Sequence, residues 1–148
     1  MDTSALFNTH KGYDDLPLRL GAGIIFAAHG AQKLFGWFGG YGIAGTGQWM
    51  ESIGLAPGAL MAALAGSAEF FGGIALILGL LTRPAALALA VTMVVAIFAA
   101  HIGNGLFMAN NGYEFGLALL VIAAGLALRG AGPLSLDHLL GRALRRGA

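Results

Sequence analysis

The sequence predicts an all-α membrane protein: a bundle of four transmembrane helices built from a duplicated helical hairpin, with a short amphipathic helix at the C-terminus. The first observation is composition, since 57% of the residues are hydrophobic and only 10% are charged. A soluble globular domain carries about 25% charged residues. The second is a set of long apolar stretches, and the third is the placement of basic residues on one side of them. At 148 residues the chain is expected to form a single domain, 1–148.

Composition also excludes several classes of function. The chain contains no cysteine, which excludes disulfide exchange by the chain itself, thiolate metal sites and iron–sulfur ligation. A net charge of +1 indicates no nucleic-acid partner. The 25 glycines are compatible with a membrane bundle, because glycine lets helix backbones approach closely in lipid.

Four apolar stretches have the length of membrane spans. They cover residues 17–36, 57–81, 84–102 and 113–129. Pro57 and Pro84 suit helix starts, and Gly130–Pro133 ends the last stretch. The segment before the first span is polar and acidic, whereas a cleaved signal peptide begins basic and soon becomes apolar. We therefore expect no cleavage there.

The basic residues predict the orientation. Outside the spans and at their edges they are Lys11, Arg19, Arg83, Arg129, Arg142, Arg145 and Arg146. The loops 36–56 and 103–112 contain neither lysine nor arginine. Because positive charges stay on the cytoplasmic side, both termini and the 81–84 turn should face the cytoplasm in a multi-pass inner (plasma) membrane protein. Lys33 departs from this pattern, but it lies inside a helix end.

Two segments outside the spans have alternative interpretations. Thr46–Ile53 is expected to form a short interfacial helix with Trp49 and Met50 towards lipid, either covering the polar groups described below or acting as a simple connector. The cytoplasmic tail, 130–148, places leucines at regular intervals among arginines. It is either an amphipathic helix on the inner membrane surface or a frayed basic tail.

An internal repeat supports the duplicated hairpin. Ile25–Tyr41 and Ile97–Tyr113, which lie 72 positions apart, share nine of 17 residues, including IFAAH in full. Glu69 and Glu114 each begin a Glu-Phe stretch that ends at an arginine, at an offset of 45. Both halves enter the membrane from the same side, so the repeat is parallel, with its axis along the membrane normal.

The repeat places five ionisable residues in the outer half of the bundle. They are His29, Lys33, Glu69, His101 and Glu114. Each glutamate lies about 21–22 Å from the arginine that ends its helix, and Lys33 is at a similar height. A charge at membrane depth costs roughly 2.5–3.5 kcal/mol, so we expect these side chains to face inward and pair.

A quinone site is one hypothesis for this cluster. Quinone reduction takes up protons together with electrons, so the site needs an acid or histidine near each carbonyl oxygen and an apolar slot. Gln32 lies on the same helix face as His29, and the ring could be flanked by Trp37, Phe70, Phe71 or Phe98. These aromatic residues fit an interface belt equally well.

Other hypotheses use the same residues differently. An ion pair of Lys33 with either glutamate could simply fix helix register, which would make the chain a non-catalytic scaffold. Two histidines and two carboxylates also suit a metal ion, although no local ligand spacing supports one. Bis-histidine haem and an ion path remain weaker alternatives.

The sequence resembles the DoxX family of small bacterial and archaeal membrane proteins. The resemblance covers about Leu18 to Leu139 and is carried by "RLGAGIIFAAHGAQKLFGWFGGYGIAGTGQWMESIGL", "AEFFGGIALILGLLTRPAAL", "FAAHIGNGLF", "NGYEF" and "GPLSLD". It implies a four-helix membrane protein. It also implies redox chemistry, because the family takes its name from a subunit of a thiosulfate:quinone oxidoreductase. Distant relatives resemble membrane assembly factors.

Together these observations predict a redox-associated membrane subunit that binds quinone, with catalysis by the chain itself left open. In this hypothesis His101 and Glu114 relay protons, His29 and Glu69 hydrogen-bond the head group, and Lys33 stabilises the reduced anion. The lipid bilayer is the expected environment. Candidate partners are quinone, a soluble or membrane redox subunit, and a second copy of the chain.

Overall fold

The computed structural model describes residues 12–146. Lys11 and the expectation about N-terminal processing lie outside this range. Within it the chain is helical and has no β-strand. The α-helices are α1 (Asp15–Phe35), α2 (Gly42–Ser52), α3 (Gly58–Leu78), α4 (Thr82–Ala96), α5 (Glu114–Arg129) and α6 (Leu136–Arg146). Short helical turns occupy Trp37–Gly39, Ile97–His101, Ile102–Asn104 and Met108–Asn110.

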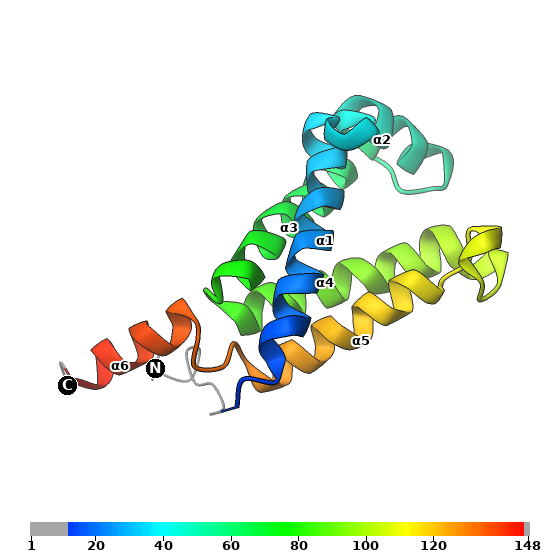
Figure 1. The fold of residues 1–148 in the computed structure, drawn as a ribbon. Helices are drawn as coiled ribbons and strands as arrows, with labels where there is room; N and C mark the ends of the chain where they lie inside the picture. The colour runs from blue at the N-terminus through cyan, green and yellow to red at the C-terminus, as the bar shows by residue number, and fades with distance from the viewer. Residues whose placement is uncertain (1–11, 147–148) are drawn as a thin grey trace.

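Four of the helices form two antiparallel hairpins. α1 packs mainly against α3, and α4 packs mainly against α5. Figure 1 shows the hairpins meeting near the turn between α3 and α4 and diverging towards their loop ends, with α2 across the end of the first hairpin. The arrangement agrees with the hairpin repeat expected from the sequence.

Two helices are long and apolar enough to cross a membrane: Gly58–Leu78, and Thr82–Asn104, which continues α4 through the two turns that follow it. α1 carries charged residues near both ends, and α5 is shorter, with 16 residues. The helix boundaries lie close to the expected ones, and Pro57 is the N-cap of α3. Residues 12–146 are therefore all-helical and include two candidate membrane spans.

Glycines set the close packing of α1 on α3. Gly23 and Gly30 lie seven residues apart on α1, and Gly66 and Gly73 repeat this spacing on α3. Because seven residues complete two turns, each pair lies on one helix face. A Cβ atom at Gly30 would lie 2.3 Å from the backbone nitrogen of Phe70, and one at Gly73 would lie 2.6 Å from the carbonyl oxygen of Gly23. The two backbones are thus closer than any side chain would allow.

The apolar core lies where the two hairpins meet. Its largest buried side chains come from α1, α3, α4 and α5: Phe26, Leu76, Leu89 and Leu126. Many other leucines, valines and phenylalanines are exposed, as expected of helices whose outer surfaces face lipid rather than water.

Hydrogen bonds and ion pairs stabilise the end of the molecule where α1 begins and α5 ends. Arg19 is 2% exposed and donates hydrogen bonds to the carbonyl oxygens of Ala131 (2.6 Å) and Leu134 (2.7 Å). Arg129 forms ion pairs with Asp14 and, at 2.9 Å, with Asp15. The segment after α5 is therefore tied back to the start of α1.

Candidate functional site

A buried ion pair joins α1 to α3. The Lys33 ammonium donates to Oε2 of Glu69 at 2.6 Å. The side chain of Glu69 is only 4% exposed, whereas that of Lys33 is 22% exposed. Gly66, about one turn earlier on α3, lies against the end of α1: an added Cβ at Gly66 would lie 2.9 Å from Cδ2 of Leu34 and 3.1 Å from Cβ of Lys33. The pair presents its cationic partner outward and keeps the carboxylate buried behind it.

An open groove of about 550 Å³ lies beside this ion pair. Gln32 and Lys33 at the end of α1 form one wall, and Tyr41, Thr46 and Trp49 from α2 and its N-cap form the other. α2 begins at Gly42, earlier than the expected Thr46. Its position against the Lys33 end of α1 supports the interpretation of this loop helix as a cover over the polar groups.

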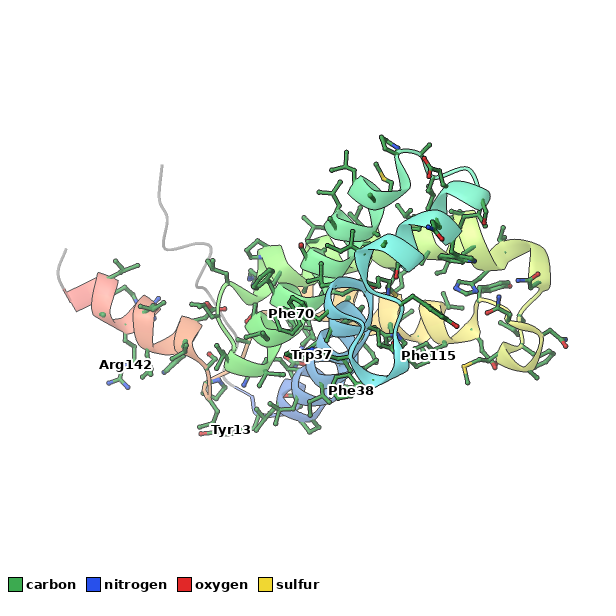
Figure 2. All side chains as sticks on the ribbon, turned by 90° about the horizontal axis from the view of Figure 1, so that it is seen from above. Tyr13, Trp37, Phe38, Phe70, Phe115 and Arg142 are labelled. Carbon is green, nitrogen blue, oxygen red and sulfur yellow. The ribbon has the colours of Figure 1, made fainter. Side chains whose placement is uncertain are left out.

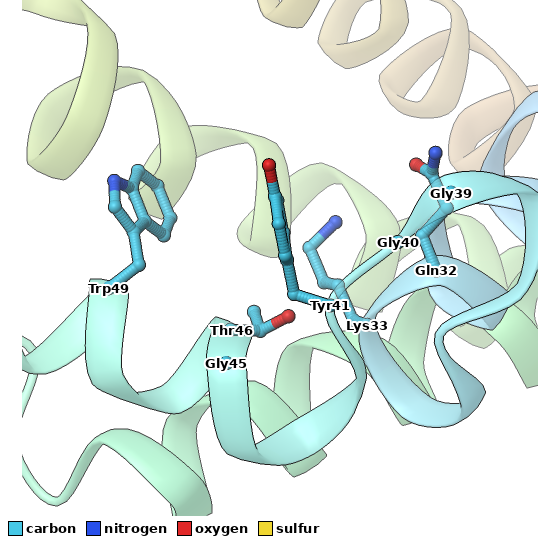
Figure 3. A pocket seen from close by; sticks show the side chains of 8 residues that line it. All are labelled: Gln32, Lys33, Gly39, Gly40, Tyr41, Gly45, Thr46 and Trp49. Atoms are coloured by element: carbon cyan, nitrogen blue, oxygen red, sulfur yellow. The ribbon is translucent and has the colours of Figure 1, made fainter.

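The α2 wall consists of two aromatic side chains with a glycine between them. Tyr41, Gly45 and Trp49 follow each other at intervals of four residues, which places them along one side of the helix. Figure 3 shows Tyr41 and Trp49 extending from the same side of α2, with the Lys33 amine beside the tyrosine. A Cβ at Gly45 would lie 2.8 Å from Cβ of Tyr41. A methyl group at Gly45 would therefore press against the Tyr41 side chain and displace its ring.

The sequence did not identify Tyr41, Thr46 or Gly45 as site residues. The four-residue spacing of Tyr41, Gly45 and Trp49 was a usable signal, but it acquires meaning only once α2 is known to lie against Lys33. Met50 corrects an expectation in the opposite direction. It is 6% exposed and packs inside the protein, so it does not extend towards lipid as predicted.

The five predicted ionisable residues divide between the two hairpins. His29 is exposed on α1, and its ring centroid lies 5.9 Å from that of Phe115 on α5. It lies one turn before Lys33 on the same helix face. Lys33, Glu69 and His29 therefore belong to the first hairpin, with His29 directed towards the second.

His101 and Glu114 organise the loop of the second hairpin. Nδ1 of His101 lies 3.0 Å from the carbonyl oxygen of Asn111, and Oε1 of Glu114 accepts a hydrogen bond from the backbone N–H of Met108 at 2.6 Å. Within residues 12–146 no hydrogen bond or ion pair connects either side chain to Lys33 or Glu69. The structure thus brings together Lys33 and Glu69, and gives His101 and Glu114 local partners.

The predicted ring-flanking residues lie outside the groove, with the exception of Gln32. Its amide donates a 3.3 Å hydrogen bond to the carbonyl oxygen of Phe38. Trp37, Phe70 and Phe71 belong to an aromatic cluster around Phe35, and Figure 2 shows Trp37 and Phe70 near each other at this end of the molecule. Phe98 is 67% exposed on the continuation of α4. The groove itself uses Tyr41 and Trp49 instead.

Metal ligands do not gather in the part of the chain that the structure describes. Among residues 12–146, no group of three His, Asp or Glu side chains is placed to hold a metal ion. His101 and Glu114 instead contact backbone groups of their own loop.

The described residues form only helices, and two of these are long and apolar. Many apolar side chains are exposed, and a buried ion pair lies at one end of the bundle. These features define a small helical membrane protein. The family model of DoxX matches residues 15–102. The chain belongs to the DoxX family.

Curated relatives match over most of their length. The chain is 35% identical to "Putative oxidoreductase CatD" of Bacillus subtilis over 132 residues, covering 89% of this chain and 90% of the relative. It is 38% identical to "Inner membrane protein YqjF" of Escherichia coli over 113 residues, covering 72% and 81% of the two chains. No solved structure matches this chain. Family and relatives indicate a membrane location.

Proposed function

We propose that the chain crosses the membrane four times, through α1, α3, the extended α4 helix and α5, with both termini on the cytoplasmic side. The hairpin pairing supports this topology, as does the gathering of the arginine positions at the end where α1 begins and α5 ends. α5, with 16 residues, spans about 24 Å and would need some local thinning or tilt adjustment of the bilayer. The Lys33–Glu69 pair then lies near the outer surface.

We further propose that this pair and the α2 groove bind the head group of a quinone, and that the protein is a redox-associated membrane subunit. The observation that supports this proposal most directly is the ion pair of the buried Glu69 with Lys33. Lys33 lines an open groove that is also lined by aromatic side chains. An ammonium group placed beside a bound ring stabilises an oxyanion as it develops during reduction. Glu69, held by Lys33 behind the groove wall, is a carboxylate that can exchange a proton through its lysine partner.

The groove suits a planar ring for steric reasons. Tyr41 and Trp49 offer two aromatic surfaces, and Gly45, which also lines the groove, lets the Tyr41 side chain keep its position. Aromatic rings interact favourably with other rings in stacked or edge-to-face geometry, typically contributing about 0.5–1.5 kcal/mol for each pair. His29 and the second-hairpin residues His101 and Glu114 are then accessory to the site rather than part of its wall.

The names of the relatives support the two halves of this proposal separately. One relative bears the name of an oxidoreductase, and another bears the name of an inner membrane protein. A scaffold function is the alternative, and the same ion pair favours it, because Lys33 and Glu69 also join α1 to α3. The two functions differ in whether the groove is occupied.

Tryptophan fluorescence can decide between them. The chain has only two tryptophans, and Trp49 lines the groove while Trp37 lies outside it. In a Trp37→Phe background, titration with a short-chain benzoquinone should quench Trp49 in a saturable manner. Gly45→Ala should weaken this binding by about tenfold or more, because the added methyl group presses on Tyr41 and displaces one of the two aromatic surfaces.

Gly103→Ala is the matched control, since a Cβ there meets nothing within 4 Å. It should leave both the quinone affinity and the unfolding temperature unchanged, and circular dichroism should show that the Gly45→Ala protein remains folded at the temperature of the titration. Quenching that rises linearly without saturation, or that is equal in the Gly45→Ala and parent proteins, would reject the quinone site and favour the scaffold.

A further inference from the structure

The C-terminal helix α6 starts from a rigid attachment to the bundle. The carboxylate of Asp137, which is 2% exposed, accepts hydrogen bonds from the backbone N–H groups of Leu81 (2.7 Å) and Thr82 (2.9 Å). The backbone N–H of Asp137 donates to the carbonyl oxygen of Gly79 at 2.8 Å. Ser135 adds a bond from the N–H of His138 to its hydroxyl. The first turn of α6 is therefore locked to the α3–α4 turn, which fixes the direction of the helix.

Beyond this attachment α6 leaves the bundle, as Figures 1 and 2 show. Leu136, Leu139, Leu140 and Leu144 follow helical spacing and form one stripe. They are 38–59% exposed. Among residues 12–146 no element packs over this stripe.

The polar side of α6 is basic. Arg142 and Arg145 lie on the face opposite the leucines, and Figure 2 shows Arg142 extending away from the bundle. Asp137 is the acidic residue of this helix, and its charge is already used by the α3–α4 turn. The free face of α6 therefore carries positive charge.

The leucine stripe continues into a shallow pocket of about 440 Å³ at the end of α3. Ile77 and Leu78 line it from α3, Leu136 and Leu139 line it from α6, and Arg19 is a further lining residue. Nε of Arg19 is buried without a hydrogen-bond partner. The apolar side chains of this pocket suit an acyl chain, whereas the exposed arginines of α6 supply the charge for an anionic head group.

We propose that α6 and this pocket bind anionic phospholipid in the leaflet on the arginine side of the bundle. Helices with a leucine face and a basic face lie in the interface, with the apolar face in the acyl boundary. Each arginine near an anionic surface contributes about 1 kcal/mol of attraction. Charge complementarity therefore selects anionic lipid over a zwitterionic surface, and the locked first turn holds α6 ready at the required depth.

The absence of cysteine in the sequence permits a clean test. Ala143→Cys in the full-length protein, labelled with an environment-sensitive fluorophore, reports from beside the leucine stripe. In nanodiscs, emission should shift to the blue as phosphatidylglycerol replaces phosphatidylcholine, and high salt should reverse the shift. Adding Arg142→Ala and Arg145→Ala should lower the apparent affinity of α6 for phosphatidylglycerol by roughly 30-fold, because each arginine contributes about 1 kcal/mol.

A label at Asn110→Cys, in the loop of the second hairpin, is the control and should show no dependence on phosphatidylglycerol. Emission from position 143 that is the same in both lipids would overturn the proposal. So would a shift that follows protein concentration instead of lipid composition, because a second copy of the chain would then cover the leucine stripe.

Discussion

Replacing Gly30 with alanine should force α1 away from α3. The new methyl carbon would lie 2.3 Å from the backbone nitrogen of Phe70 and 2.7 Å from the carbonyl oxygen of Gly66. Favourable contacts between heavy atoms begin near 3.5 Å, so the two backbones must separate by about 1 Å. Overpacking of this kind typically costs about 1–3 kcal/mol, and backbone atoms cannot relieve it by changing rotamer.

Gly21→Ala on the same helix is the matched control, because a Cβ at Gly21 meets nothing within 4 Å. Alanine is favoured over glycine in a helix interior by about 1 kcal/mol, so this variant should be equal to or more stable than the parent. The measurement is the free energy of unfolding in detergent, followed by circular dichroism during SDS titration. If Gly30→Ala proves as stable as Gly21→Ala, the close approach of α1 and α3 is wrong.

Three further changes test the polar contacts. Glu69→Gln should destabilise the protein in thermal unfolding by about 3 kcal/mol, because a partly buried Lys33 loses its partner. The double variant Lys33→Met, Glu69→Leu removes both charges and should recover most of this stability. A double variant as unstable as Glu69→Gln would contradict the explanation. Asp137→Asn should cost about 1–3 kcal/mol and expose the C-terminal segment to limited proteolysis; unchanged digestion would exclude the lock. Glu114→Gln should raise the hydrogen-exchange rate of the Met108 amide about tenfold and leave the quinone affinity unchanged. A change in quinone affinity would show that Glu114 belongs to the binding site.

The repeated segments show how two copies of one sequence take different roles. IFAAH is α-helical in α1 but forms a π-helical turn at Ile97–His101, where the N–H of Ile102 reaches the carbonyl oxygen of Ile97. The lysine of the first copy, Lys33, has Gly105 at its equivalent position 72 residues later. Without that lysine, Glu114 accepts its hydrogen bond from a loop N–H instead. The two hairpins therefore differ in the feature that makes the first one a candidate site.

The sequence by itself determined the helical class and the positions of the helices. Apolar stretches bounded by proline, glycine and arginine limit where helices can begin and end, and these signals act within a few residues. It also identified Lys33 and Glu69, because a charge in an apolar helix requires a partner wherever the chain places it. The positions of the arginines relative to the apolar stretches also predicted an orientation, because positive charges near span ends stay on the cytoplasmic side.

Only the tertiary structure decided which of these groups meet. The separation of His101 and Glu114 from Lys33 depends on the divergence of the two hairpins, and the groove depends on α2 lying against the end of α1. The absence of a side chain at Gly30 allows contact with the backbone of Phe70, which is distant in the sequence, and at Gly45 it allows contact with Tyr41, one turn away. Local sequence patterns record which surfaces are apolar or charged, but the angle between packed helices arises from contacts along their whole length.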